Sequence, residues 1–316
     1  MEMKKAALAL APMAGVGDRA FREVCAPFGV DLFTSEMISA KALTYGDKKS
    51  VLLADHGPSE APFFLQLFGS EPAVVGEAVG ILAEKTAFDG IDLNFGCPVP
   101  KIVKNGEGSA LLRSPDLCGR IVEAAVAAAP CPVSVKMRLG WDGDHLTAVE
   151  VARVCEAAGA ARLTVHGRTR ADLYRDGTVR IDEIARVAAA VTIPVFANGD
   201  VKDGASAVRM LAETGAAGIA VGRGALGRPW VFAEIRAALE GKSAPAVDRK
   251  AVMRRHVALA FRYKPLAAAG ELRTHMAHYL RGFRGAAALR AAVSAAATPA
   301  DYEALIARLP DRAGAR

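Results

Sequence analysis

A short apolar run, a loop and an amphipathic segment recur in order through residues 1–240. The apolar runs lack strict alternation with polar residues, as expected of parallel strands buried on both faces. The predicted strands are Leu8–Pro12, Leu32–Ser35, Phe63–Leu67, Gly90–Asn94, Val133–Met137, Arg162–Val165, Val195–Ala197 and Gly218–Val221. The predicted helices are Arg19–Cys25, Ala73–Thr86, Asp116–Ala128, Leu146–Ala158, Ile181–Ala190 and Ala205–Thr214, whereas 38–54 shows no clear pattern. Eight such units favour an α/β fold of the TIM (β/α)8 type over an open doubly wound sheet.

Length and composition leave room for this large domain and a smaller one. The chain has 316 residues, of which 52% are hydrophobic and 23% charged, as in ordinary globular proteins. No apolar run reaches the roughly 18 residues that span a bilayer, so no membrane partner is predicted. The apolar start Ala6–Ala11 imitates a secretory signal, but Pro12 interrupts it and Asp18-Arg19 follow closely. We therefore expect a cytoplasmic protein whose first barrel strand lies there.

Positive charge is concentrated near the C-terminus. Residues 241–316 contain 14 Lys and Arg against 5 Asp and Glu, a net charge of +9, whereas the whole chain carries +6. Residues 1–240 therefore carry a net charge of −3. A basic module beside a nearly neutral body is consistent with a polyanionic partner, and equally with a solvated helical surface. We predict two domains, a catalytic barrel over 1–240 and a basic helical domain over 241–316.

One of the five cysteines stands in an unusual setting. Their number is odd and no pair has CxxC spacing, which argues against disulfides and against a zinc site, and for a reducing compartment. Cys97 follows the predicted strand Gly90–Asn94 in a Gly96-Cys97-Pro98 turn, where loops of rigid scaffolds carry working groups. A buried structural thiol is the alternative for Cys97 and the preferred interpretation of the other four.

The carboxyl ends of the predicted strands gather a consistent set of polar residues. In a TIM barrel these ends form the active-site face. They carry Gln66, Asn94, Cys97, Lys136 and His166. Glycines and charges follow the last two strands, where barrels often bind phosphate through backbone N–H groups and arginine. These residues are Asn198, Gly199, Asp200, Gly222 and Arg223, and they predict a mononucleotide-phosphate site. No strand-linked GxGxxG motif supports a Rossmann-type site.

In these motifs the chain resembles bacterial tRNA-dihydrouridine synthases, in particular their B-type subgroup. The matching segments run in order over nearly the whole barrel. They are Ala11-Pro12-Met13-Ala14-Gly15-Val16-Gly17-Asp18-Arg19-Ala20-Phe21-Arg22, Ser35-Glu36-Met37, Asn94-Phe95-Gly96-Cys97-Pro98, Lys104–Leu112, Lys136–Trp141, His166–Arg170, Ile193–Asp200 and Gly222–Trp230. Residues 250–310 are similar to the helical RNA-binding domain of that family, although Thr274 stands where a basic residue is common.

The resemblance implies FMN as tightly bound cofactor and NADPH or NADH as reductant. It implies that Pro12, Met13 and Ala14 line the flavin, and that Gln66 and Lys136 bind the edge of its ring. Asn198, Gly199, Asp200, Gly222 and Arg223 would hold the phosphate, with His166 nearby. Hydride would pass from flavin N5 to C6 of uridine, and Cys97 would protonate C5. Predicted substrate contacts are Asn94, Arg273 and His275.

The predicted partner is tRNA, whose target uridine must leave its stacked position to reach the barrel mouth. No obligate protein partner and no metal are predicted. Two alternatives stay open. One is an FMN barrel of the dihydroorotate dehydrogenase kind acting on a free pyrimidine, which needs no basic tail. The other is a flavin-bearing RNA-binding protein, against which the set Cys97, Lys136 and His166 speaks.

Overall fold

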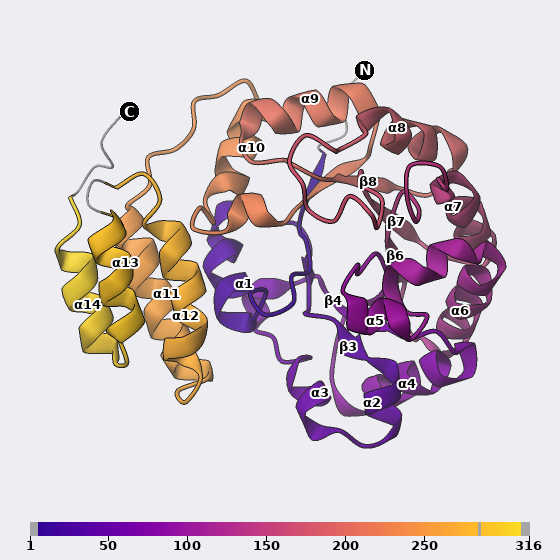
Figure 1. Ribbon diagram of the computed structural model, residues 1–316, viewed down its shortest axis with the longest axis horizontal. Coiled ribbons are helices and arrows are strands. Elements are labelled where there is room, and N and C mark those ends of the chain that lie inside the picture. The colour runs from indigo at the N-terminus through magenta and orange to yellow at the C-terminus, as the bar shows by residue number, and fades with distance from the viewer. Residues whose placement is uncertain (1–5, 284–285, 311–316) are drawn as a thin grey trace.

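The computed structural model describes residues 6–283 and 286–310, and eight parallel strands form a barrel within them (Figure 1). The hydrogen-bonded order is β1-β9-β8-β7-β6-β5-β4-β2. A parallel bridge between Ala9 and Leu32 joins β1 to β2 and closes the ring. The strands are β1 Ala7–Leu10, β2 Phe33–Thr34, β4 Phe63–Phe68, β5 Gly90–Phe95, β6 Val133–Arg138, β7 Arg162–His166, β8 Val195–Asn198 and β9 Gly218–Val221. The prediction of a TIM barrel is confirmed.

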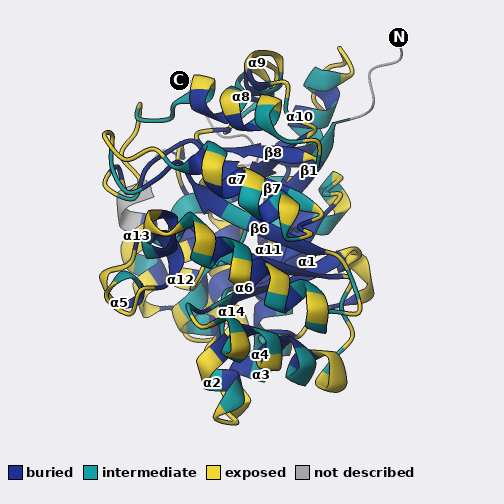
Figure 2. Cartoon of the chain, turned by 90° about the vertical axis from the view of Figure 1, so that its right-hand side faces the viewer, coloured by how far each residue is buried: buried dark blue, intermediate teal, exposed yellow. Residues whose placement is uncertain are grey.

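Helices cover the outside of the barrel and turn their polar faces to solvent (Figure 2). They are α1 Arg19–Cys25, α4 Pro72–Lys85, α6 Pro115–Ala128, α7 Ala148–Ala157, α8 Ile181–Ala190, α9 Gly204–Thr214 and α10 Val231–Leu239. Local signals fix their ends. Asp203 caps α9 by accepting a hydrogen bond from the Ser206 N–H at 2.8 Å, and Gly215 ends it in the left-handed region at φ +64°. Pro72 and Pro115 occupy the first turns of α4 and α6, where a missing N–H costs nothing.

The segment without a clear sequence pattern folds into short pieces. β3 (Ile38–Ser39) pairs with the end of β4, and α2 (Ala40–Thr44) and α3 (Lys48–Leu52) follow it. Each is too short to show a period of its own, which is why the sequence did not reveal them. The other short helices are α5 (Pro100–Lys104) and the 3₁₀ turns η1 (Ala26–Phe28), η2 (Pro58–Glu60), η3 (Gly108–Arg113) and η4 (Arg223–Ala225).

In the described part of the chain, four helices follow the barrel and pack around a hydrophobic core of their own. They are α11 Arg249–Tyr263, α12 Ala268–Tyr279, α13 Ala286–Ala295 and α14 Pro299–Ala307. They lie beside α1 (Figure 1), and α11 contacts it directly. Tyr263 donates a hydrogen bond to Glu23 at 2.7 Å, and the Arg19 guanidinium lies 4.1 Å from the Tyr263 ring centre. No helix of the described residues is both long and apolar enough to cross a membrane.

Candidate active site

A cavity of about 960 Å³ opens at the carboxyl ends of the strands. Residues from several strand ends and from the C-terminal helices line it. All eleven residues predicted to hold the cofactor are among them: Pro12, Met13, Ala14, Gln66, Lys136, His166, Asn198, Gly199, Asp200, Gly222 and Arg223. Asn94 and Cys97 line the same cavity, whereas Arg273 and His275 do not.

The register of the sheet explains why these polar residues meet. Lys136 lies opposite Asn94, and His166 lies opposite Asn198. Because side chains alternate between the two faces of a strand, residues two positions earlier point into the barrel one layer lower. That lower layer includes Phe64 and Phe196, between which the Arg162 guanidinium packs, 4.5 and 5.2 Å from their ring centres. The polar layer therefore rests on a filled barrel interior.

The turn that carries Cys97 is held by Asn94. The Asn94 side-chain oxygen accepts hydrogen bonds from the N–H groups of Gly96 at 3.0 Å and Cys97 at 2.8 Å. The Cys97 carbonyl accepts from the Ser109 N–H at 3.0 Å and the Ser109 hydroxyl at 2.9 Å. Arg138 donates to the Gly96 carbonyl at 2.8 Å. The position of the thiol is thus fixed from both sides of the turn.

The Cys97 thiol is half-buried at the cavity wall. Burial raises its pKa above the ordinary value, although the Val99 N–H and the charges of Arg138 and Lys136 act in the opposite direction. The group is therefore a neutral thiol near neutral pH. A neutral thiol can donate a proton, whereas nucleophilic attack would need the thiolate.

A chain of buried hydrogen bonds runs beneath Cys97. Asn94 donates to the Gln66 carbonyl oxygen at 2.9 Å, and Gln66 donates to Asp92 at 2.7 Å. Asp92 accepts from Ser134 at 2.6 Å, and Ser134 accepts from Arg162 at 3.0 Å. Both ends of the Gln66 amide are engaged, so its remaining N–H and lone pair have a fixed direction. Asp92 was not predicted as a site residue. An acidic residue inside a largely apolar strand is the sequence signal that could have identified it.

Lys136 is a half-buried cation without a partner among the described residues. Its ammonium forms no hydrogen bond or ion pair with the residues that the structure describes, and it lines the cavity. Burial, and then the nearby charge of Arg138, lowers the pKa of Lys136 from the usual 10.5 to about 8. A cation that is partly removed from water and has no partner is unfavourable. Its placement fits a cavity that receives a group carrying negative charge or strong acceptors.

His166 and Asp200 are organised by Arg168, a fully buried arginine. Arg168 donates to both Asp200 oxygens, at 2.8 and 2.6 Å, and to His166 Nε2 at 3.2 Å. Since arginine only donates, Nε2 accepts and Nδ1 carries the proton of the neutral ring. Burial, with the positive charges around it, keeps the pKa of His166 well below its ordinary value. His166 is therefore a neutral hydrogen-bond donor.

The loops after β8 and β9 form a cradle of free N–H groups. Within the described residues, the N–H groups of Gly199, Asp200, Gly222 and Arg223 form no backbone hydrogen bond. Gly199 has φ +132° and Asp200 φ +49°, a local geometry that turns successive amides toward one side. A side chain on Gly224 would stand 2.3 Å from the Val201 carbonyl, so this turn requires glycine. The donors of the cradle suit a phosphate group.

Arg223 lies at the rim of this cradle and is half exposed. It donates to the Tyr174 carbonyl at 3.2 Å and to Asp200 at 3.3 Å. Asp200 is thus bound by two arginines, and its carboxylate would repel a phosphate rather than bind it. We infer that Asp200 acts in the cradle through its N–H group and by orienting Arg223.

The C-terminal helices complete one wall of the cavity. Arg249, His278 and Arg281 line it together with Arg228 of the barrel. Arg249 Nε and His278 Nδ1 are buried and have no hydrogen-bond partner among the described residues. The Arg249 guanidinium also lies 4.5 Å from the Phe283 ring centre. The sequence showed the charge of this segment but not which residues face the cavity.

The two predicted substrate contacts in the tail lie elsewhere. Arg273 is exposed on α12, outside the cavity lining. His275 is only 3% exposed and lies between α1 and α11. Its burial argues against direct contact with RNA.

The fold and the site define a barrel enzyme with a phosphate-type cradle, an unpartnered half-buried cation and a thiol at one mouth. The family described as dihydrouridine synthase (Dus) matches residues 9–313, and the chain belongs to it. A probable tRNA-dihydrouridine synthase of Rhodobacter capsulatus is 47% identical over 237 residues, covering 75% of this chain and 72% of that protein. tRNA-dihydrouridine synthase B of Pseudomonas syringae is 41% identical over 289 residues, covering 90% and 85%. Its counterpart in Xanthomonas campestris is 38% identical over 314 residues, covering 95% and 94%.

Proposed function

We propose that this chain is an FMN-dependent tRNA-dihydrouridine synthase, which reduces the C5–C6 double bond of uridines in tRNA with electrons from NADPH or NADH. Membership of the family and the names of the relatives support the reaction and the RNA substrate. The observation that carries the proposal is the joint placement of Cys97, Lys136 and the N–H cradle around one cavity. We expect the enzyme to act in the cytoplasm, as predicted from the sequence.

The residues present fit FMN. The free N–H groups of Gly199, Asp200, Gly222 and Arg223 suit one terminal phosphate, and Arg223 adds charge. The unpartnered ammonium of Lys136, beside Gln66, suits the polar edge of a flavin ring, where a cation stabilises the negative charge of the reduced form. Pro12, Met13 and Ala14 provide an apolar wall. When bound, FMN supplies the hydride that adds to C6 of the uracil ring.

Cys97 is placed to complete the reduction as general acid. Its neutral thiol gives its proton to C5 of the uracil as the double bond is saturated, and the sulfur keeps the S–H electron pair as a thiolate. The Val99 N–H and the charges of Arg138 and Lys136 stabilise that thiolate until solvent reprotonates it. Asn94 has two proposed roles. It holds the Gly96-Cys97 turn in place through its side-chain oxygen, and it contacts the edge of the uracil.

The C-terminal helices are proposed to hold the tRNA. Arg249, His278 and Arg281 reach the cavity from that side, so RNA bound on these helices lies beside the mouth of the barrel. Extruding a uridine costs a few kcal/mol, which phosphate contacts and stacking in the cavity can offset. A free pyrimidine as substrate would leave the basic residues on this wall of the cavity without a role. No feature described in the site specifically favours such a substrate.

A reconstituted reaction tests the proposal. The purified protein, loaded with FMN, is incubated with tRNA that lacks dihydrouridine and with NADPH or NADH in parallel. Mass spectrometry of digested tRNA should show a gain of two mass units in particular uridines. Reduction of free uridine at a comparable rate, with intact tRNA unchanged, would favour the alternative of a free-pyrimidine enzyme.

A further inference from the structure

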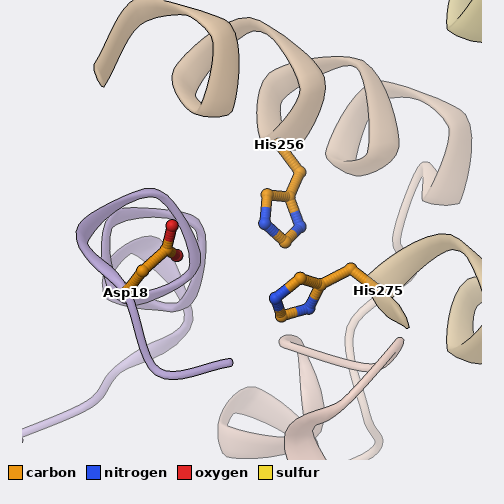
Figure 3. Close-up of side chains that lie close together, drawn as sticks. All are labelled: Asp18, His256 and His275. Carbon is orange, nitrogen blue, oxygen red and sulfur yellow. The ribbon is translucent and has the colours of Figure 1, made fainter. Parts of the chain in front are cut away.

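Three ligand-type side chains meet at the junction between the barrel and the C-terminal helices, outside the lining of the cavity. Asp18 precedes α1, His256 lies on α11 and His275 lies on α12. One oxygen or nitrogen atom of each lies within 4.8 Å of the other two, and all three residues are buried. Figure 3 shows the carboxylate and the two imidazole rings turned toward one another.

Contacts within the protein account for only part of this arrangement. No hydrogen bond joins any two of the three side chains in the described part of the chain. Asp18 accepts from the Phe21 N–H at 3.0 Å, and its other oxygen lies 3.3 Å from the Lys264 ammonium. His275 Nδ1 is buried with no partner among the described residues. Buried polar groups of native proteins are almost always paired, so the cluster is incomplete with protein atoms alone.

The protonation states are those of metal ligands. Burial lowers the pKa of His275 to about 4 and holds the pKa of His256 well below its ordinary value, so both rings are neutral. Burial acts to raise the pKa of Asp18, but the Phe21 N–H and the charge of Lys264 outweigh it. The resulting set is one carboxylate and two neutral imidazoles.

We propose that Asp18, His256 and His275 bind one divalent transition-metal ion, for which Zn²⁺ is the best suited. Two imidazoles and a carboxylate are ligands that Zn²⁺ accepts, and a water molecule can complete the tetrahedron. Bonds of about 2.0–2.2 Å require the three side chains to draw together by roughly 1 Å. The scattered cysteines argued against a zinc site, and this one uses none of them.

The surroundings support the same site. The Tyr279 hydroxyl lies 3.2 Å from His256 Nδ1, which leaves Nε2 of that ring for the metal and fixes its orientation. The Phe21 ring packs on both histidines, with ring centres 4.8 Å from His275 and 5.8 Å from His256. The Lys264 ammonium also donates to the two Glu271 carboxylate oxygens, at 3.0 and 3.1 Å. Lys264 therefore keeps a partner when the Asp18 carboxylate binds a metal ion.

The ion would act as a clamp between the two parts of the chain. Asp18 belongs to the barrel, whereas both histidines belong to the C-terminal helices. Metal binding would therefore stabilise the docking of α11 and α12 on α1. This inference rests on its own residues and does not depend on the proposed reaction.

The test uses the untagged, FMN-loaded full chain, because an affinity tag of histidines would bind metal itself. After dialysis against a chelator and then against buffered Zn²⁺, elemental analysis should give one ion per chain, and added Zn²⁺ should raise the Tm. Asp18→Asn keeps the helix cap while removing the charge, and His275→Gln removes a ligand. Loss of a residue that only hydrogen-bonds to a metal ligand typically lowers metal affinity by roughly 10–100-fold. Each of these two variants loses a ligand itself and should lower Zn²⁺ affinity by more than that. His145→Gln, which alters an exposed histidine beside Asp142, is the matched control and should bind as the unchanged chain does.

Spectroscopy on the unchanged chain keeps the proposal testable even if a variant fails to fold. X-ray absorption of the zinc-loaded protein should show two imidazoles and no sulfur ligand, and Co²⁺ should give the visible bands of a four-coordinate site. Less than a tenth of an ion per chain at saturating Zn²⁺, sulfur ligation, or full binding by folded Asp18→Asn and His275→Gln chains would overturn it. The variants leave the flavin site untouched, so flavin content should stay constant throughout.

Discussion

Replacing Lys136 with methionine should stabilise the flavin-free protein at neutral pH while weakening flavin binding. Burial lowers the pKa of Lys136 from 10.5 to about 8, which means that folding disfavours its charged form. Below pH 8 both the folded and the unfolded chain carry the proton, so the cost to stability is complete. As pH rises from 8 to 10.5 the folded chain loses its proton first, and the cost disappears.

The magnitude follows from the displacement of the pKa. A tenfold change in an ionisation constant is worth about 1.4 kcal/mol, so the cost is about 3 kcal/mol. This is an upper value, because part of the side chain faces a cavity that water can enter. Methionine has a similar length and no charge, so the variant should gain up to about 3 kcal/mol at pH 7 and about nothing near pH 10.5. Loss of the charge-assisted contact should weaken flavin binding by about 1.5–3 kcal/mol.

Urea unfolding of flavin-stripped protein at both pH values measures the first effect, and fluorescence titration with FMN measures the second. Lys85→Met, at the exposed end of α4, controls for loss of a surface charge and should show neither effect. A Lys136→Met protein that is less stable than the unchanged chain at pH 7 would refute the reasoning, since the ammonium would then be compensated within the protein.

Three further outcomes are expected. Arg223→Ala should release FMN more readily, by about 1.5–3 kcal/mol in binding free energy, and the flavin recovered from the unchanged chain should be FMN rather than FAD. Because the pKa of Cys97 is raised by burial, uridine reduction should decline only at pH values above the ordinary thiol pKa of about 8.5, as a pH–rate profile would show. Single alanine changes at tail arginines that touch phosphate should each lower the salt slope of tRNA binding by about 0.7–0.9, without altering flavin reduction. Six arginines of the C-terminal segment are candidates for these phosphate contacts. They are Arg254, Arg255, Arg262, Arg273, Arg281 and Arg284, the last of which lies outside the described residues. Unchanged affinity and slope in all six variants would move RNA recognition to the barrel rim at Lys101, Lys104 and Arg170. Arg168, also predicted there from the sequence, is fully buried and bound to Asp200, so it does not face RNA.

These arginines do not stand in equivalent settings. Arg254 is engaged with Glu303 at 2.7–3.0 Å, so its charge is partly neutralised within the protein. Arg281 lines the cavity directly. We therefore expect the larger loss of tRNA affinity from Arg281→Ala.

The repeating strand and helix pattern predicted the barrel because most of its units, although not the segment after the second strand, are long enough to show a period of their own. The bounds of α1 and α8 agree with prediction to the residue, since a capping aspartate and an acidic first turn mark their starts. β3, α2 and α3 could not be predicted, because pairing with β4 rather than local pattern defines them.

The sequence could predict which residues at strand ends line the cavity. It could not predict the contacts that depend on how loops and helices pack. Position at a strand end carries Gln66, Lys136 and His166 to one mouth in any closed parallel barrel. The engagement of Asp200 by Arg168 and the burial of His275 depend on how loops and helices pack. No spacing in the sequence brings Asp18 next to two residues more than 230 positions away.

Separating the two half-reactions in the Cys97→Ala variant tests the central claim most directly. Stopped-flow absorbance measures reduction of the bound flavin by the nicotinamide, and rapid quench with mass spectrometry then measures dihydrouridine formed in unmodified tRNA. The account predicts an unchanged first step and a second step slower by about 10²–10⁴-fold. Uridine reduction at the unchanged rate would show that the proton comes from another group, and the assignment of Cys97 as general acid would be wrong.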